Sequence, residues 1–221
     1  VDRTLGGGDQ RRAPGLFSVK ADGSGMRQLI KMRRDVYVSQ RQNERLLEWD
    51  HELLAVPETG ESKVIVGRVT RSAVGDVESI APLLLDVQTQ QTRSLAMGAP
   101  EGATGWWFDA TGRPWLVSTT REGTSTYHWR RSEDSGWAPI ASGPTLRMPF
   151  LAHSTDSAGQ LFVTMARGAA GYRALHRFDF ATGKPEATPL VSTPGFDFAG
   201  RLVSAYGDGR TLGVRTTTDA E

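Results

Sequence analysis

Groups of residues that could do chemistry occur at a few places, and none of them completes a catalytic or metal-binding motif. His51-Glu52-Leu-Leu-Ala55 begins like the helical motif of zinc proteases, but Ala55 stands where the second histidine is needed. His153-Ser154-Thr-Asp156 combines the residue types of a catalytic triad, although triads assemble from segments distant in sequence. We therefore predict no metal site at His51 and a turn at Asp156.

The motifs of nucleophilic catalysis are also incomplete in this sequence. The nucleophile elbow of α/β-hydrolases requires Gly-x-Ser-x-Gly, and the nearest sequences, Gly60-Glu-Ser62-Lys-Val64 and Gly123-Thr-Ser125-Thr-Tyr127, lack the second glycine. The chain has no cysteine, which excludes thiolate nucleophiles and sulfur-based zinc sites. His128 and His176 fall in expected strands beside aromatic residues, where packing or a pore-facing position is favoured. We predict no catalytic, metal-binding or cofactor-binding residue and no cofactor.

Glycine-rich and basic segments are typical of turns and solvated surface. Asp22-Gly-Ser-Gly25 lacks the glutamate that closes a calcium loop, and Gly207-Asp-Gly209-Arg-Thr-Leu-Gly213 misses the dinucleotide-binding spacing, so both indicate turns. Residues 27–45 are locally basic, but their only aromatic residue is Tyr37, which argues against a nucleic-acid site. With 26 Lys and Arg against 25 Asp and Glu, the net charge of +1 attracts no polyanion.

A recurring phrase predicts the elements that carry these residues. Asp is followed three residues later by Gly and then by an apolar run in Asp109–Val117, Asp156–Thr164 and Asp197–Ala205. The copies begin 47 and 41 residues apart, close to the period of about 40 to 50 residues of propeller blades. Aspartate can bond its own turn backbone and glycine can take positive φ, so each copy predicts a turn that leads into a strand.

A second phrase predicts hairpins. Two runs of strand-forming residues flank a tight turn in Gly15–Ile30, Pro82–Leu95 and Ala174–Lys184, with Asp-Gly or Thr-Gly in the first and third. In Gln40–Val56 a strand or irregular structure is favoured. A short amphipathic helix is the alternative, because a helical spacing links Leu46, Trp49, Leu53 and Leu54.

These phrases predict an all-β chain: a partial β-propeller of about four blades of antiparallel sheet with incomplete outer blades. We expect one domain over residues 1–221. Its blades are expected at 1–40, 41–97, 98–142, 143–192 and, as the start of another, 193–221. No apolar run is long enough for a membrane helix. Val1–Gln10 contains neither an initiating methionine nor the apolar core of a signal peptide, so we expect the chain to be part of a longer protein. The sequence is compatible with a cytoplasmic or a periplasmic or secreted location.

Five of the six tryptophans lie close together in the sequence, and core packing is expected for most of them. The set is Trp106, Trp107, Trp115, Trp129 and Trp137. Trp106 and Trp107 are adjacent and must point to opposite faces of a strand, so one of these two is the favoured exposed aromatic residue.

Several of these phrases resemble the N-terminal propeller of the prolyl oligopeptidase family of serine peptidases, including its dipeptidyl aminopeptidase and acylaminoacyl peptidase branches. The similar segments are Pro57–Val66, Leu84–Thr89, Trp107–Pro114, Tyr172–Lys184 and Phe196–Val203. The resemblance implies a non-catalytic gate and scaffold that works with a C-terminal α/β-hydrolase domain of the same parent and admits small peptide substrates. The alternative is a stand-alone protein-binding propeller, similar to Tol-system or WD-repeat scaffolds, with no parent enzyme.

Overall fold

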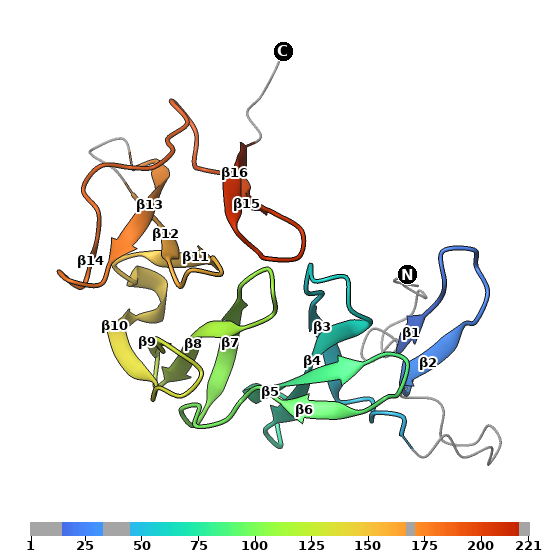
Figure 1. Ribbon diagram of the computed structural model, residues 1–221. Helices are drawn as coiled ribbons and strands as arrows, with labels where there is room; N and C mark the ends of the chain where they lie inside the picture. Colours follow the sequence, from blue (N-terminus) through green and yellow to red (C-terminus); the bar gives the residue numbers. More distant parts are fainter. Residues whose placement is uncertain (1–14, 33–44, 167–170, 217–221) are drawn as a thin grey trace. The chain divides into compact units, whose positions relative to one another are not determined.

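The computed structural model describes residues 15–32, 45–166 and 171–216 (Figure 1). In these ranges the regular structure is β, apart from one short 3-10 turn, η3 (Thr145–Arg147). No helix of the described residues could cross a membrane. The expected all-β class is confirmed. Residues 45–56 contain a strand, His51–Ala55, so the strand reading is confirmed there and the rest of Gln40–Val56 lies outside the described residues.

The chain divides into two compact units. The first comprises Val1–Val56 and Glu61–Met97, and the second comprises Pro57–Gly60 and Gly98–Glu221. Each sheet falls within one of these units. Four sheets also lie within the residue ranges expected for blades, whereas one strand of the fifth, Ala138–Pro144, extends past the expected boundary at residue 142. A closed ring of blades remains a prediction.

The first unit holds a two-stranded hairpin and a four-stranded antiparallel sheet. The hairpin pairs β1 (Leu16–Ser18) with β2 (Arg27–Ile30), and the sheet has the order β3 (His51–Ala55), β4 (Lys63–Arg71), β5 (Val77–Asp86) and β6 (Thr92–Ser94). The buried core contains Leu29 and Ile30 of the hairpin with Val66 and Leu85 of the sheet. The hairpins expected over Gly15–Ile30 and Pro82–Leu95 are therefore confirmed.

The second unit holds two four-stranded antiparallel sheets and a two-stranded hairpin. The first sheet contains β7 (Ala103–Phe108), β8 (Pro114–Arg121), β9 (Thr124–Trp129) and β10 (Ala138–Pro144). The second contains β11 (Leu151–Thr155), β12 (Leu161–Ala166), β13 (Arg173–Asp179) and β14 (Lys184–Pro185). The hairpin pairs β15 (Gly200–Ser204) with β16 (Thr211–Thr216). In both sheets each strand pairs with its sequence neighbours, as in a simple meander.

Two of the three Asp-x-x-Gly phrases form the turn between the first and second strands of a sheet. At Asp109 and at Asp156 the residue's N–H donates to the carbonyl four residues on, and its carboxylate accepts two backbone N–H groups of the same turn. At the third copy the predicted strand follows as β15, but residues 197–199 form no turn. The carboxylate of Asp197 instead accepts the N–H of Arg173 at 2.7 Å, so it ties the start of the hairpin to β13.

Apolar side chains fill the space between successive sheets of the second unit. The larger cluster joins the sheet of β7–β10 to that of β11–β14 and includes Trp115, Trp129, Leu161, Val163 and Phe178. A smaller cluster joins the second sheet to the hairpin. It contains Phe162, Leu175 and Phe198, with Leu202 and Val214 at its edge. Each sheet thus covers one apolar face of the next, which is the packing that the hydrophobic effect favours for amphipathic sheets.

The first strands of these sheets lie beside one another. Strands β7 and β11 are in contact, and the His153 imidazole Nε2 of β11 lies 2.9 Å from the carbonyl oxygen of Gly200 in β15. The turns that follow the first strands also meet. A Cβ added to Gly209 would lie 3.0 Å from Thr111 and 3.3 Å from Ser157, which are in the turns after β7 and β11.

A glycine pair allows this sheet-to-sheet packing to be tested. Gly159 (φ +81°) lies against Trp115, since an added Cβ would be 3.0 Å from its ring, whereas Gly183 (φ +69°) has open space around it. Both alanine variants adopt an unfavourable φ, but only Gly159→Ala also strains the core. Gly159→Ala should therefore lower the free energy of unfolding by about 1 kcal/mol or more beyond Gly183→Ala. Urea titration followed by tryptophan fluorescence reports on the second unit, and equal losses in both variants would contradict the packing.

The carboxylate of Asp86, in the turn between β5 and β6, should make the free energy of unfolding depend on pH. Hydrogen bonds from the N–H groups of Thr89 and Gln88 lower the pKa of Asp86 below its ordinary value. A carboxylate whose pKa falls on folding stabilises the native state above its unfolded pKa, and this contribution is lost as pH falls through the folded pKa. Asp86→Asn should flatten part of the loss of stability between about pH 5 and pH 2. Carbon-detected NMR of the Asp86 carboxyl gives the direct check, and a midpoint at or above the ordinary value would refute the assignment.

Candidate binding site in the second unit

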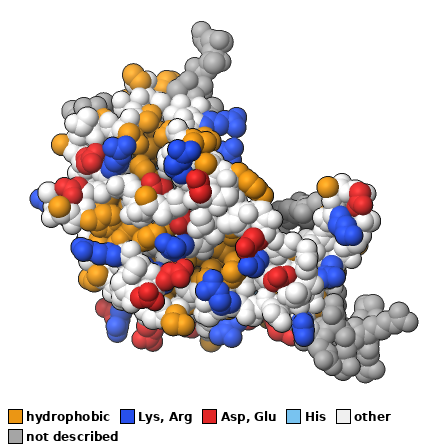
Figure 2. Space-filling view, viewed as in Figure 1, with side chains coloured by type: hydrophobic (Ala, Val, Ile, Leu, Met, Phe, Trp, Pro, Cys, Tyr) orange, Lys and Arg blue, Asp and Glu red, His pale blue; other side chains and the backbone are white. Residues whose placement is uncertain are grey.

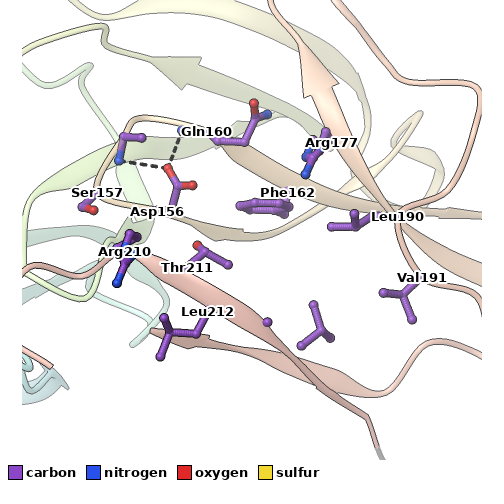
Figure 3. Close-up of a pocket in the computed structure, with 13 residues that line it drawn as sticks. Asp156, Ser157, Gln160, Phe162, Arg177, Leu190, Val191, Arg210, Thr211 and Leu212 are labelled. Carbon is purple, nitrogen blue, oxygen red and sulfur yellow. Dashed lines mark hydrogen bonds between the residues drawn. The ribbon is translucent and has the colours of Figure 1, made fainter. Parts of the chain in front are cut away.

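A cavity of about 640 Å³ lies between the second sheet and the last hairpin (Figure 3). Three parts of the second unit form its walls: the turn after β11, the face of β12 and β13 with the segment after β14, and strand β16. The lining residues that carry the argument are Phe162, Arg177, Leu190, Arg210, Thr211 and Leu212. This volume lies in the range of pockets that bind small molecules or a small group of side chains from a partner.

The floor of the cavity is apolar because the hairpin covers only part of the sheet. Phe162 is 3% exposed and belongs to the core cluster that Leu175 and Phe198 complete. Leu190 and Leu212 line the cavity on opposite sides and remain 39% and 60% exposed. A ligand that covers these side chains would gain the hydrophobic free energy that they now lack.

Two guanidinium groups adjoin this apolar floor. Arg177 is the cross-strand partner of Phe162, so both side chains stand on the same face of the sheet. Arg210 lies across the cavity at the start of β16, as Figure 3 shows. Both residues are exposed, and within the described residues no carboxylate lies at ion-pair distance from either guanidinium. The two groups are therefore available for an anion.

A hydroxyl group at the cavity has no partner. The Oγ1 atom of Thr211 is buried and makes no hydrogen bond within the described part of the chain. Such a group costs about 1–3 kcal/mol relative to a hydrogen-bonded one. The carboxylate of Asp156 also lines the cavity, and its Oδ1 accepts the N–H groups of Ala158 and Gln160. The site thus combines an apolar floor, two arginines, one carboxylate and a hydroxyl without a hydrogen bond.

The combinations singled out in the sequence do not form this site. His51 lies 2.8 Å from Asp50 and 3.1 Å from the Glu48 carbonyl in the first unit, and the described residues contain no group of three metal ligands. His153 contacts Ser154 Oγ at 2.8 Å through Nδ1 and the Gly200 carbonyl through Nε2. Both ring nitrogens are engaged and Asp156 caps its own turn, so these residues form no triad. The expected turn at Asp156 is confirmed.

The other histidines belong to the sheets. His176 is fully buried and its Nδ1 lies 2.8 Å from the Glu186 carbonyl, which confirms the packing role. His128 lies 3.2 Å from Thr119 Oγ1, and burial lowers its pKa.

Core packing is confirmed for Trp115 and Trp129, which are 5% and 4% exposed. Trp106 and Trp107 are both half-buried, so neither is the expected exposed aromatic residue. Trp107 packs on the core, and its ring meets Tyr127 edge-on at 5.6 Å. Trp106 instead stacks with Phe108 and meets Trp137 edge-on at 5.8 Å.

The glycine-rich segments are turns, as expected. Ser24 donates to the Asp22 carboxylate in the turn of the first hairpin, and the Ala205 N–H donates to the Arg210 carbonyl in the turn of the last hairpin. In the basic segment, Arg27 and Arg45 donate to carbonyl groups of residues 87–89, and Lys31 pairs with Glu48. The remaining cations of this segment and Tyr37 lie outside the described residues. On the face in Figure 2, acidic and basic side chains are interspersed.

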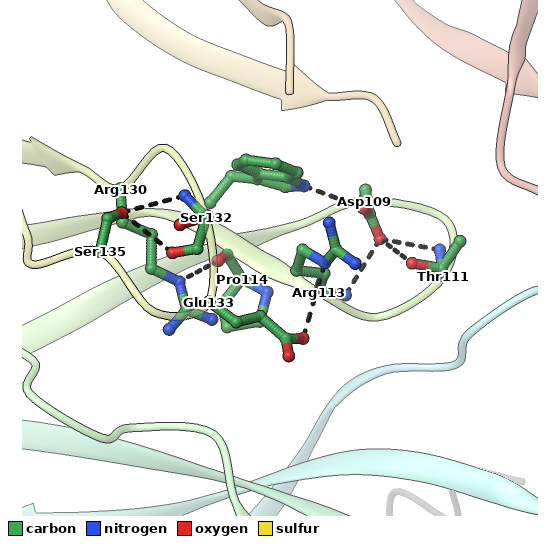
Figure 4. A network of polar contacts seen from close by, with 9 residues as sticks. Asp109, Thr111, Arg113, Pro114, Arg130, Ser132, Glu133 and Ser135 are labelled. Atoms are coloured by element: carbon green, nitrogen blue, oxygen red, sulfur yellow. Dashed lines mark hydrogen bonds and ion pairs between the residues drawn. The ribbon is translucent and has the colours of Figure 1, made fainter. Parts of the chain in front are cut away.

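The polar network around Asp109 resembles a functional site in its residue types, but its role is structural (Figure 4). Asp109 is 5% exposed, and its Oδ1 accepts the N–H and hydroxyl of Thr111 and the N–H of Arg113. Its Oδ2 accepts the indole N–H of Trp115 at 2.8 Å. All these acceptor positions are occupied within the chain, so the network fixes a core tryptophan and leaves little capacity for a ligand.

No protein-family model, curated protein or solved structure matches the chain. The site is therefore interpreted from its own geometry.

The sequence did not reveal this cavity, because Arg177 and Arg210 come from different sheets. Their cationic character is visible in the sequence, but only the packing of the hairpin on β12 and β13 brings them to one cavity.

The structural role of Asp109 leads to a paired prediction. Asp109→Ala leaves the buried indole N–H of Trp115 and the turn N–H groups without partners, and it should lower the free energy of unfolding by about 3 kcal/mol. Asp179→Ala removes the carboxylate of an exposed turn that bonds Ala181 and Thr182, and it should cause a clearly smaller loss. Urea titration compares the two variants, and equal losses would contradict the role of Asp109.

Proposed function

We propose that this chain is a non-catalytic binding and gating scaffold made of consecutive propeller blades. The observation that supports the proposal best is the repeated sheet. The described residues form three four-stranded sheets, and all three are antiparallel meanders of the same order. Within the second unit, the first strands lie side by side and the turns after them meet. Propeller blades are meanders of this kind, arranged with their first strands toward a central channel.

The chemistry of the described residues favours binding over catalysis. A catalytic acid or base needs a positioned partner, whereas the histidines and aspartates above engage backbone groups, turn residues or the core. The cavity instead offers two exposed arginines and the Thr211 hydroxyl, which makes no hydrogen bond within the described residues. Cations beside an apolar floor attract and hold an anionic partner, but they supply no proton transfer.

The more specific form of the proposal places the scaffold in a prolyl oligopeptidase-like serine peptidase. In that case the chain limits the size of peptides that reach an α/β-hydrolase domain elsewhere in the parent. The resemblance of segments such as Trp107–Pro114 supports this form. The alternative is a stand-alone propeller that binds a protein partner, and the free arginines at the cavity favour it.

Two measurements test the proposal. The purified chain should release no chromophore from aminoacyl and peptide p-nitroanilide substrates, and turnover that survives repurification would contradict the non-catalytic role. An experimental structure of the full parent protein should place the four-stranded sheets around one axis. Sequencing the coding region downstream then separates the two forms, because the peptidase form requires a Gly-x-Ser-x-Gly domain and the stand-alone form requires a complete ring without one.

A further inference from the structure

The turn that follows β3 belongs to the second unit, although the strands on either side of it belong to the first. This turn is Pro57–Gly60, between β3 and β4. The Glu58 N–H donates to the Ala110 carbonyl in the turn after β7 at 2.7 Å, and the Glu58 carbonyl accepts the Gly207 N–H in the turn after β15 at 2.7 Å. One residue therefore joins turns from two sheets that are not consecutive in the sequence.

Exposed residues hold this contact, and little buried apolar surface supports it. Glu58 and Gly207 are exposed, and so are Gly60 and Tyr206, which lie close together because a Cβ added to Gly60 would be 2.6 Å from the Tyr206 hydroxyl. Pro57 is the buried residue of the turn. Segments with exposed backbone hydrogen bonds and few buried apolar contacts open locally, without unfolding of the core. The turn can therefore leave its two neighbours while the sheets stay intact.

The two hydrogen bonds of this turn should break together. Both belong to the backbone of Glu58, one to its N–H and one to its carbonyl, so a movement of this residue away from either neighbour removes both. Neither bond uses a side chain. The contact therefore depends on the backbone at residue 58 and not on the carboxylate that it carries.

We propose that Pro57–Gly60 is a lid that joins the turns after β7 and β15 when closed and opens by local unfolding. Opening frees an acceptor, the Ala110 carbonyl, and a donor, the Gly207 N–H, at the ends of two first strands. The inference rests on the gating role proposed above and names the element that moves.

Hydrogen exchange followed by NMR tests whether the lid opens by itself. Relative to their intrinsic rates, the amides of Glu58 and Gly207 should exchange at least about tenfold faster than those of Val117 and Val163, which lie buried in β8 and β12. Low concentrations of urea should accelerate exchange at the two valines and leave the lid amides unchanged, because local opening exposes little surface. Lid amides that follow the valines would overturn the proposal.

Two substitutions at one position separate the backbone from the side chain. Glu58→Ala keeps both hydrogen bonds and should change the exchange rate of the Gly207 amide by less than about twofold. Glu58→Pro removes the N–H that bonds Ala110, and because the two bonds break together it should accelerate exchange at Gly207 by about tenfold. Equal effects of the two variants, or an unchanged Gly207 amide in Glu58→Pro, would show that Glu58 holds no lid.

An amide of the neighbouring turn provides the control. The Gly112 N–H donates to the Asp109 carbonyl within the turn after β7 itself. Its exchange, like that of Val163, should stay within about twofold in Glu58→Pro. A matching acceleration at Gly112 would mean that residues 57–60 support the fold instead of closing over it, and would refute the lid. The proposed scaffold role fails by different measurements, namely substrate turnover or sheets that share no axis in the parent.

Discussion

The structure of the second unit depends on burying the apolar face of each sheet against the next one. Trp115 shows how closely the sheets are coupled: its indole N–H donates to Asp109 in its own sheet, its ring stacks on Trp129 at 5.5 Å, and Gly159 of the next sheet lies against its edge. A meander sheet alone would leave one such face in water. The same turn geometry recurs at Asp109 and Asp156, because each carboxylate accepts N–H groups of its own turn. In the second of these turns Gly159 also allows the close approach to Trp115.

This constraint also accounts for the candidate site. Among the described residues, the β15–β16 hairpin packs on the second face of the sheet of β11–β14, so Phe162 and Leu175 are buried while Leu190 is 39% exposed. The cavity therefore begins where the covering strands stop. The two arginines lie at this boundary, because a charge inside the core would be costly. The unpartnered hydroxyl of Thr211 lies beside them.

The sequence predicts local turns well and the site poorly, for a physical reason. The Asp-x-x-Gly phrase at Asp109 and Asp156 and the turns at Asp86 and Asp179 are fixed by hydrogen bonds within a few residues, so the residue types reveal them. Asp197 has the same phrase, but its carboxylate binds Arg173 of another strand, and no local pattern reports that contact. The site is a non-local feature of the same kind, since Arg177 and Arg210 meet only through the packing of β16 beside β13.

The nearly neutral charge of the chain gives the local arginines a particular role. At a net charge of +1 the protein exerts no long-range attraction on an acidic partner, so steering contributes little to association. Exposed cations are also screened beyond about 8–10 Å at physiological salt. The guanidinium groups can therefore discriminate only at contact, where a carboxylate reaches them and apolar side chains exclude water. At the cavity beside Arg177 and Arg210, selectivity must then come from the position of the charge on a bound group, and affinity mainly from the apolar area that the group covers.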